Sequence, residues 1–422
     1  MMIKRAILSK FKTLSLNSYI SEKSVQGLLL LFQILSLFLV ISRDIKNFNK
    51  TKFSFMIGLV VFVYVSIKLV QKFTSGDYYI VLIANMLFSI GVLEIYRLEP
   101  KLAFRQIIWF FIGNIVFWIV YLILKYVKIW SKLFYFYAII SYGLFLATLV
   151  LGKTINGAKN WIRFGSNFAF QPSEIIKIAF IFLIASFYKN REKFENGLLK
   201  RNKLHFFFYT FIAFLFLQKD LGSVLVFSGV FIFAQYMYEP HRRYMFINFM
   251  ILSLGAILGY VLFTHVKVRV KIWIDPFKYA DGMGYQIIQG FYAIASGGFF
   301  GSGLGLGRPD YIPFAESDYI FASICEEMGI LMGMGIVMLF LILTYRGIKI
   351  SMEQSNKFYR YVAFCLSLIF AFQSLIMFGG ILKLIPLTGI TIPFVSYGGS
   401  SILSSFIALG VLQYSSEENI GG

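Results

Sequence analysis

Long apolar runs recur along almost the whole chain, and a short polar segment separates each run from the next. A bilayer core about 30 Å thick is crossed by roughly 20 helical residues, with a range of about 17–25. The runs therefore predict about twelve transmembrane helices, of which the seventh and the last are short. Their expected positions are 25–42, 54–71, 78–96, 105–125, 133–151, 173–188, 204–218, 222–238, 244–264, 318–345, 360–379 and 399–413. This pattern predicts an all-α polytopic membrane protein.

The composition excludes an ordinary soluble fold. Of the 422 residues, 58% are hydrophobic and 14% are charged, whereas soluble domains contain about 45–50% apolar and about 25% charged residues. The formal net charge is +20, which in a soluble chain would suggest nucleic acid. Here the Lys and Arg residues lie in short groups between the apolar runs, as they do in cytoplasmic loops of membrane proteins. We expect membrane lipid, and no nucleic acid, as a partner.

The basic groups also predict the orientation of the chain. The run 25–42 is long enough to span and has no small-residue cleavage site close behind it, so we interpret it as a retained helix rather than a signal peptide. The strongest basic group, within 189–203, marks a cytoplasmic loop. Counting alternate loops from it places both termini in the cytoplasm. The basic residues within 43–52 oppose this orientation, and most of the other loops support it.

Three expected external segments are too long or too apolar to be simple connectors. They cover residues 152–174, 265–317 and 379–400. Structureless loops of such length are uncommon inside compact proteins, so we expect the second to be folded and partly re-entrant. Irregular backbone at membrane depth is tolerated where it is buried in protein or lines a cavity. The three segments are therefore expected to frame one external cavity.

Few ionisable residues fall inside an apolar run or at its mouth, and such residues are functional candidates by default. They are Glu174, Lys177, Asp220, Asp275, Asp318, Glu326 and Glu327. Asp318 is either a helix cap or a carboxylate at the mouth of the cavity, suited to general-base chemistry. Glu174 and Lys177 share one helix face, as a functional pair or as part of a well-capped helix. Asp220 is likewise either a functional carboxylate or the cap of the helix that follows it.

Other residue types point to no further chemistry. Cys325 and Cys365 lie in apolar surroundings and the histidines fall in separate segments, so their spacing predicts neither a disulfide framework nor a metal site. The glycine series 297–307 lacks the preceding strand and the Gly-Lys-Ser/Thr ending of a nucleotide loop. We expect it to allow close backbone packing or a tight turn beside a substrate.

A series of short motifs occurs in a fixed order along residues 78–415. They are GAKNWI at 157–162, FQPSEIIK at 170–177, QKDLGS at 218–223, RVKIWIDP at 269–276, GMGYQIIQ at 282–289, AIASGG at 293–298, GSGLGLG at 301–307, SDYIFASICEEMG at 317–329 and PLTGITIPFVSYGGSS at 386–401. Together they resemble the SEDS family (shape, elongation, division and sporulation). Asn160 stands where that family usually has Arg, and Lys219 where it has Pro.

The resemblance implies a ten-helix SEDS core with two additional N-terminal helices and a large structured external loop before the tenth helix of the chain. It divides the chain into a cytoplasmic N-terminus with two extra helices at 1–77, the transmembrane core at 78–415 and a short cytoplasmic tail at 416–422. It also implies a multi-pass location in the cytoplasmic membrane.

The resemblance further implies a peptidoglycan glycosyltransferase, an inverting enzyme that polymerises lipid II into β-1,4-linked glycan strands on the outer face of that membrane. The position that matches the family's essential aspartate is Asp318, expected to act as general base. A class B penicillin-binding protein is the expected partner. Two alternatives remain open: a lipid II flippase, and a non-catalytic scaffold for the penicillin-binding protein.

Substrate contacts are expected from the other motif residues and from basic residues that could hold the pyrophosphate of the leaving group. The pyrophosphate candidates are Lys159, Arg163, Arg269 and Lys271. The remaining substrate-binding candidates are Trp161, Glu174, Lys177, Asp220, Asp275, Glu326, Ser396, Tyr397 and Ser400. A divalent cation, Mg²⁺ or Mn²⁺, is left open as a further source of positive charge, and no ligand cluster in the sequence requires one.

Overall fold

The computed structural model describes residues 22–43, 50–155, 157–164, 168–195, 203–239, 241 and 243–417. The chain divides into two compact units, Met1–Lys68 and Leu69–Gly422. In the first unit, the described residues form α2 (Glu22–Arg43) and most of α3 (Lys50–Phe73). These two helices lie where the sequence predicts the first two apolar helices.

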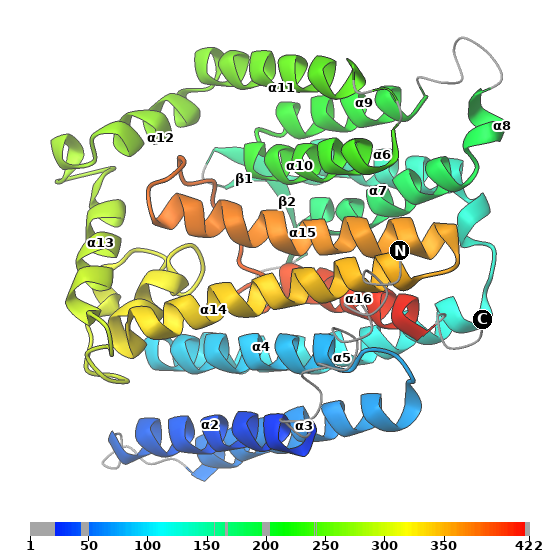
Figure 1. Cartoon of the computed structure of the whole chain (residues 1–422). Coiled ribbons are helices and arrows are strands. Elements are labelled where there is room, and N and C mark those ends of the chain that lie inside the picture. The colour runs from blue at the N-terminus through cyan, green and yellow to red at the C-terminus, as the bar shows by residue number, and fades with distance from the viewer. Residues whose placement is uncertain are drawn as a thin grey trace, which may run out of the picture. The chain divides into compact units, whose positions relative to one another are not determined.

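The second unit is a helical bundle with the element order shown in Figure 1. Its longer helices are α4 (Tyr79–Leu98), α5 (Pro100–Tyr126), α6 (Phe134–Leu151), α7 (Pro172–Lys189), α9 (Lys203–Leu217), α10 (Leu221–Tyr238), α11 (Arg243–Leu262), α14 (Ile320–Glu353), α15 (Lys357–Ile381) and α16 (Gly399–Glu417). Shorter helical pieces are the 3₁₀ turn Trp130–Lys132, α8 (Arg191–Glu195), α12 (Thr264–Ile274), the 3₁₀ turn Phe277–Tyr279, α13 (Tyr285–Gly297) and the 3₁₀ turn Pro309–Tyr311.

Seven of the described helices are long and apolar enough to cross a membrane: α4, α5, α6, α10, α11, α14 and α15. The 15-residue α9 is short, as predicted, and α7 carries three charged residues, while α16 is rich in serine. In α7 and α16 polar side chains bond inside the bundle, where Lys177 donates to Glu174 and Ser404 donates to Glu174. The chain is thus a multi-pass α-helical membrane protein, as predicted, and the exact number of spans stays a prediction.

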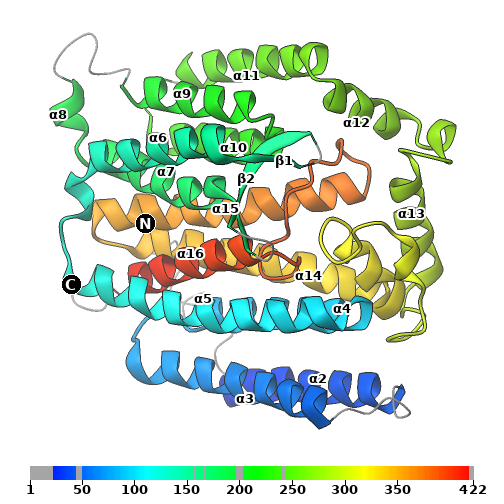
Figure 2. The ribbon, with the colours of Figure 1, turned by 180° about the vertical axis from the view of Figure 1, so that it is seen from behind.

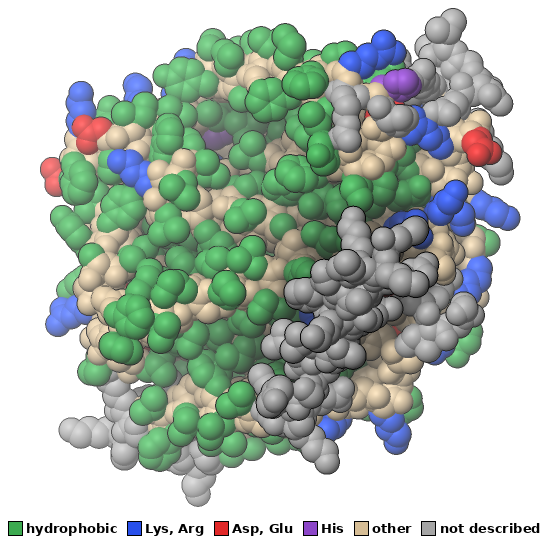
Figure 3. All heavy atoms as spheres, in the orientation of Figure 1, with side chains coloured by type: hydrophobic (Ala, Val, Ile, Leu, Met, Phe, Trp, Pro, Cys, Tyr) green, Lys and Arg blue, Asp and Glu red, His purple; other side chains and the backbone are tan. Residues whose placement is uncertain are grey.

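Burial separates the central helices from the peripheral ones. In α4 and α15 the most apolar stretches are 83% and 78% buried, whereas the corresponding stretch of α11 is 11% buried. The inner helix α16 packs against α5, α7 and α15, as Figure 2 shows from behind. A face that bears apolar side chains without burying them matches a lipid environment. Figure 3 shows such side chains over much of one face, with Lys and Arg toward its sides.

Aromatic stacking holds the part of the bundle formed by α7, α9 and α10. The rings of Phe208 and Phe231 stack at 3.8 Å between centroids, and those of Phe180 and Phe227 at 5.1 Å. All four side chains are buried. In a membrane, van der Waals packing of this kind replaces the hydrophobic effect as the main attraction between helices.

The first long loop folds as a small sheet, which the sequence did not predict. Strands β1 (Lys153–Ile155), β2 (Ala158–Phe164) and β3 (Phe168–Phe170) pair antiparallel in the order β1-β2-β3. The amide of Lys159 also donates to the carbonyl of Gln218 at 2.9 Å, which ties the sheet to the turn before α10. The all-α expectation therefore holds for the apolar helices and not for this loop.

The second long loop is folded, as predicted. It contains α12, α13 and the glycine series, and Figure 1 shows α12 and α13 at one end of the helices of the bundle. We call the end formed by α12, α13 and the segment 382–398 the loop end. At the opposite end, the last turns of α5 and α7 and the connector between α5 and α6 carry Lys125, Lys128, Lys132 and Lys189.

The glycine series packs against a break in α14. At Gly329 the backbone has φ 81° and ψ 166°, so the regular helix is interrupted. The amides of Ser302 and Gly303 donate to the carbonyls of Glu326 and Glu327, and the amide of Ile330 donates to the carbonyl of Gly298. At the break, backbone groups of α14 therefore bond to the backbone of the loop instead of to their own helix. The predicted role of the glycines in close backbone packing is confirmed.

Replacing Gly329 with Ala is expected to destabilise the protein by about 2–3 kcal/mol, because a side chain at positive φ is strained. The added Cβ would also lie 2.4 Å from the Phe299 carbonyl oxygen. The measurement is thermal unfolding in detergent micelles. Gly335 on the same helix is the control, since its added Cβ would meet nothing within 4 Å. Equal midpoints for the two Ala variants would contradict the prediction.

Candidate active site

The third long loop enters the bundle and is held there from several sides. The side-chain amide of Gln373 on α15 donates to the carbonyl of Thr391 at 3.0 Å. Phe394, at φ 65°, is buried and places its ring 5.7 Å from the rings of Phe370 and Phe406. Non-glycine residues take such a φ when their surroundings enforce it. The segment 382–398 is therefore a fixed wall of the loop end.

Asp318 lies between this wall and the start of α14. A turn at Phe314 precedes it, in which the amides of Ser317 and Asp318 both donate to the Phe314 carbonyl at 3.1 Å. The wall supports the same turn, because the Ser396 hydroxyl donates to the Ser317 carbonyl at 2.8 Å and the Tyr397 amide donates to the Glu316 carbonyl at 2.9 Å. The backbone that carries Asp318 is thus bound to the wall on one side.

Arg269 of α12 faces Asp318 across Gly389. A Cβ added at Gly389 would lie 3.5 Å from Arg269 Nη2 and 3.6 Å from Asp318 Oδ2. Arg269 Nη1 also donates to the Thr388 carbonyl at 2.9 Å. Gly389 has φ 71°, a backbone conformation that favours glycine. A carboxylate and a guanidinium therefore share one small space beside the wall.

The surroundings shift the pKa values of both groups. Burial raises the pKa of Asp318 to about 6, the positive charge of Arg269 opposes that rise, and the negative charge of Glu316 adds to it. Burial lowers the pKa of Arg269, and the charges of Asp318 and Asp220 oppose the change. A carboxylate with a pKa near neutrality is suited to accept a proton and to release it again.

Asp220 is the second carboxylate near Arg269. It caps α10, because its Oδ1 accepts the Ser223 amide at 3.1 Å and its Oδ2 accepts the Ser223 hydroxyl at 2.9 Å. Its Oδ2 also accepts the side-chain amides of Asn160 at 3.1 Å and Gln171 at 3.3 Å. The capping alternative is therefore realised, and the same carboxylate joins β2 and the start of α7 to the site.

Two further basic groups lie near Arg269. Lys219, at φ 60°, places its ammonium 5.9 Å from the centre of the Phe263 ring. The pKa of His265 is lowered by burial and by the charges of Arg269 and Lys219. Because His265 is then neutral at pH 7, Arg269 and Lys219 carry the positive charge of this region.

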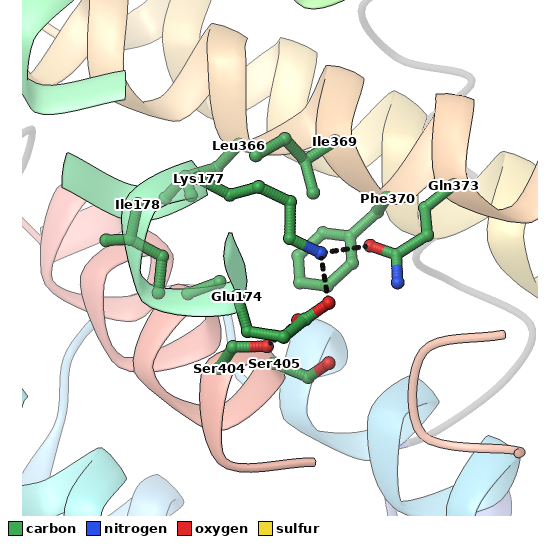
Figure 4. A pocket seen from close by; sticks show the side chains of 10 residues that line it. Glu174, Lys177, Ile178, Leu366, Ile369, Phe370, Gln373, Ser404 and Ser405 are labelled. Carbon is green, nitrogen blue, oxygen red and sulfur yellow. Dashed lines mark hydrogen bonds and ion pairs between the residues drawn. The ribbon is translucent and has the colours of Figure 1, made fainter. Parts of the chain in front are cut away.

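Glu174 and Lys177 form a buried pair behind the wall (Figure 4). The Lys177 ammonium lies 2.8 Å from Glu174 Oε1 and donates to Gln373 Oε1 at 3.0 Å. The Ser404 hydroxyl of α16 donates to Glu174 Oε2. Figure 4 shows these groups around a pocket that Ile178, Leu366, Ile369 and Phe370 also line. Gln373 bonds both Lys177 and the wall, so the pair is connected to the Asp318 site.

Other predicted residues lie apart from Asp318 or serve the backbone. Asp275 is exposed and accepts the Lys278 amide at 3.2 Å, so it caps a turn. Ser400 accepts the Gln171 amide at 3.2 Å, and Lys159 Nζ donates to the Leu149 carbonyl at 2.5 Å. Trp161 is partly exposed, and Arg163 and Lys271 are exposed.

Glu326 belongs to a different cluster at the break in α14. Its Oε1 accepts the Arg308 amide at 2.7 Å, and Glu327 Oε2 accepts the Gly305 amide at 2.7 Å. Arg97 lies 2.6 Å from Glu327 Oε1 and 2.6 Å from Asp310 Oδ1. This arrangement fastens the glycine series to α14 and α4, and a substrate contact of Glu326 stays a prediction.

Sequence reasoning missed the uncharged side chains that connect the site. They are Gln106, Asn160, Gln171, Gln373, Thr388 and Ser404. Inside a span only charged residues stood out from an apolar background, and a single Gln or Ser carries no such signal. Arg97 was also missed, although an arginine in the last turn of an apolar run was a readable signal.

Within the described part of the chain, no three His, Cys, Asp or Glu side chains gather as a set that could hold a metal ion. The two carboxylates nearest Arg269 are Asp318 and Asp220, and Asp220 already accepts four hydrogen bonds.

Comparison with known proteins decides the family. The sequence model of a family described as "Cell cycle protein", which comprises FtsW, RodA and SpoVE, matches residues 78–420. The chain belongs to this family. Residues 78–420 contain every element of the site described above, and the two N-terminal helices α2 and α3 precede them.

Relatives of this FtsW/RodA/SpoVE family member include enzymes and sporulation proteins. This chain is 31% identical over 360 residues to the peptidoglycan glycosyltransferase RodA of Mycobacterium tuberculosis. The alignment covers 78% of this chain and 76% of the relative. The chain is 33% identical over 371 residues to stage V sporulation protein E of Bacillus subtilis, with 81% and 97% covered.

Solved structures show the same fold. A chain from a structure entitled "Structural coordination of polymerization and crosslinking by a peptidoglycan synthase complex" superposes with a TM-score of 0.70 at 22% identity, covering 82% of this chain and 99% of that one. The rod shape determining protein RodA of Thermus thermophilus superposes with a TM-score of 0.61 at 19% identity, covering 83% and 100%. At these identities the likeness concerns the fold alone.

In this family member, breaking the Glu174–Lys177 pair from one side is expected to destabilise the fold by about 3–5 kcal/mol, because one buried charge is left unpaired. Glu174→Gln and Lys177→Met should each lower the unfolding midpoint in detergent. The double variant should recover most of the loss, since it leaves no buried charge.

The control is the exposed pair Lys349–Glu353, whose atoms lie 3.8 Å apart. Breaking it should cost at most about 1 kcal/mol. Additive losses in the Glu174→Gln/Lys177→Met double variant would show that the two side chains act independently.

Proposed function

We propose that this protein is a peptidoglycan glycosyltransferase that polymerises lipid II into β-1,4-linked glycan, with Asp318 as the general base. The observation that carries the proposal is the half-buried Asp318 carboxylate facing Arg269 across Gly389, with a pKa of about 6. Membership of the FtsW/RodA/SpoVE family supports it, as do the names of relatives that are called peptidoglycan glycosyltransferases.

The proposed reaction is a single displacement. The Asp318 carboxylate takes the proton of the acceptor sugar hydroxyl as the hydroxyl oxygen forms a bond to the anomeric carbon of the donor. The bond from that carbon to the polyprenyl pyrophosphate breaks, and its electron pair leaves with the pyrophosphate. Attack from the opposite face inverts an α-linked donor to a β linkage.

Arg269 is the residue best placed to hold the pyrophosphate. It lies on α12 beside Asp318, and Lys219 adds positive charge nearby. Fixed positive charge in a site of low dielectric stabilises a developing anion more than it does in water. The other candidates are less suited, because Lys159 is bonded to the Leu149 carbonyl and Arg163 and Lys271 are exposed.

The remaining features of the proposal concern location and partners. We place the loop end on the outer face of the cytoplasmic membrane and both termini in the cytoplasm, which the basic residues at the opposite end support. Residues 1–77 would form an N-terminal extension of the transmembrane core. A class B penicillin-binding protein is the proposed partner, supported by the likeness in fold to a chain of a peptidoglycan synthase complex.

The activity test uses purified protein with its penicillin-binding partner and labelled lipid II, with glycan polymer measured on a gel. Asp318→Asn and Asp318→Ala are each expected to lose at least about 100-fold in rate, the usual contribution of a general base. Asp281→Asn, an exposed carboxylate in the same long loop, should retain wild-type activity.

Three outcomes would overturn the proposal. If the wild-type complex makes no polymer and instead moves lipid II across vesicle membranes, the flippase alternative holds. If Asp318→Ala polymerises as fast as the wild type, Asp318 is not the base. Wild-type protein that neither polymerises nor transports lipid II, but binds the penicillin-binding protein, would be a scaffold.

The rate is expected to depend on pH through Asp318. Only the carboxylate form accepts a proton, so the rate should fall about tenfold for each pH unit below about 6 and level off above it. Arg269 lowers the pKa of Asp318, so Arg269→Met should move this limb to higher pH. Lys267→Met, on the same helix, should leave the limb in place. A limb that does not move with Arg269→Met would contradict the assignment of the limb to Asp318.

A further inference from the structure

Gln106 is a buried polar side chain of α5 that the family resemblance did not single out. It is 1% exposed. Its Nε2 donates to the Ser396 carbonyl at 2.9 Å, and its Oε1 accepts the Gly398 amide at 3.2 Å. One side-chain amide therefore satisfies a donor and an acceptor of the wall on either side of Tyr397.

Ser396 carries this connection toward the catalytic candidate. Its hydroxyl accepts the Ile392 amide at 3.0 Å and donates to the Ser317 carbonyl at 2.8 Å. The Tyr397 amide makes a parallel bond to the Glu316 carbonyl at 2.9 Å. A continuous series of hydrogen bonds thus runs from α5 through the wall to the residue before Asp318.

The wall itself has little freedom to move at this point. A Cβ added at Gly91 of α4 would lie 2.3 Å from the Val395 carbonyl oxygen, so helix and wall are in direct backbone contact. Phe394 packs on the opposite side between Phe370 and Phe406. Gln106 therefore bonds to a segment that α4, α15 and α16 already hold.

Asp318 depends on this support more than a typical buried carboxylate does. Among the groups that the structure describes, none donates a hydrogen bond to the Asp318 carboxylate. Its position then follows from the backbone of the turn 314–318, and that backbone is bound to the wall through Ser317 and Glu316.

We propose that Gln106 is a positioning residue for Asp318, which it holds in place through Ser396 and the backbone of Ser317. The inference rests on the proposed function of Asp318 as general base. A base must stand within hydrogen-bond reach of the attacking hydroxyl, and a displacement of about 1 Å can cost about 100-fold in rate. Gln106 touches neither substrate nor reacting atoms in this role.

The first measurement is independent of activity. Hydrogen–deuterium exchange of the full-length protein with its partner is followed in peptides that cover 314–319 and 392–398. Gln106→Met keeps the length of the side chain and removes both hydrogen bonds, so exchange in both peptides should rise about five- to tenfold, as expected for the loss of one or two bonds. Ser396→Ala should raise exchange in 314–319.

The second measurement is the steady-state rate of polymerisation. Gln106→Met and Ser396→Ala are each expected to lower kcat about 10- to 100-fold, with KM for lipid II within about twofold of the wild type. Both changes interrupt the same series of bonds. The kcat of the double variant should therefore be no lower than that of the more impaired single variant.

Matched controls exist on the same elements. Asn114→Leu also removes a buried amide from α5, but that amide donates only to the Phe110 carbonyl of its own helix. Ser374→Ala removes a buried hydroxyl that bonds carbonyls of α15. Both controls should leave exchange in 314–319 and kcat at wild-type values, which separates positioning from general loss of a buried polar group.

The outcomes distinguish this inference from the proposed function. Unchanged exchange in Gln106→Met, or raised exchange with an unchanged kcat, would overturn the positioning role. A raised KM with an unchanged kcat would also overturn it, because Gln106 would then act on substrate binding. Wild type that makes no polymer would refute the proposed function, while the exchange data would still decide whether Gln106 holds the turn at Asp318.

Discussion

Backbone groups that enter the membrane interior must find hydrogen-bond partners in the protein, and this constraint organises the whole loop end. An unpaired backbone amide or carbonyl in an apolar environment costs several kcal/mol. The segment 382–398 enters the bundle without regular secondary structure. Its backbone is satisfied by side chains that reach it from neighbouring helices, namely Gln106 of α5 and Gln373 of α15, and by Ser396 within it. The helices therefore define the shape of the wall.

The same wall brings opposite charges together. It contacts Arg269 at Thr388 and supports the turn before Asp318 at Ser396 and Tyr397. The guanidinium of Arg269 and the carboxylate of Asp318 both lie close to Gly389. Burial disfavours the ionised form of Asp318 and so raises its pKa, and the positive charge of Arg269 offsets part of that effect. The site thus balances desolvation of Asp318 against the nearby charge of Arg269.

The sequence predicts the helices more directly than it predicts which side chains lie together, for a physical reason. Each expected apolar run corresponds to a helix within a few residues at most ends, because spans must satisfy their own backbone and must be apolar over a bilayer thickness. In the first long loop, β1, β2 and β3 form a small sheet. Short strands with turn residues between them have no strong signal in a sequence dominated by long apolar runs. Among the predicted site residues, Asp318, Arg269 and Asp220 lie near one another, whereas Asp275 caps the turn after α12 and Glu326 accepts an amide at the end of the glycine series.

The sequence by itself determined that this chain is a multi-pass helical protein and which charged residues stand at the mouths of its helices, since hydropathy and charge are properties of composition and spacing. Only the tertiary structure decided which of those charges meet. It also showed the role of uncharged side chains such as Gln106, Gln373 and Ser404, whose partners lie more than a hundred residues away or on another helix. Hydrogen bonds of that kind depend on the distance and direction between two atoms, and neither quantity is present in the sequence until the helices have packed.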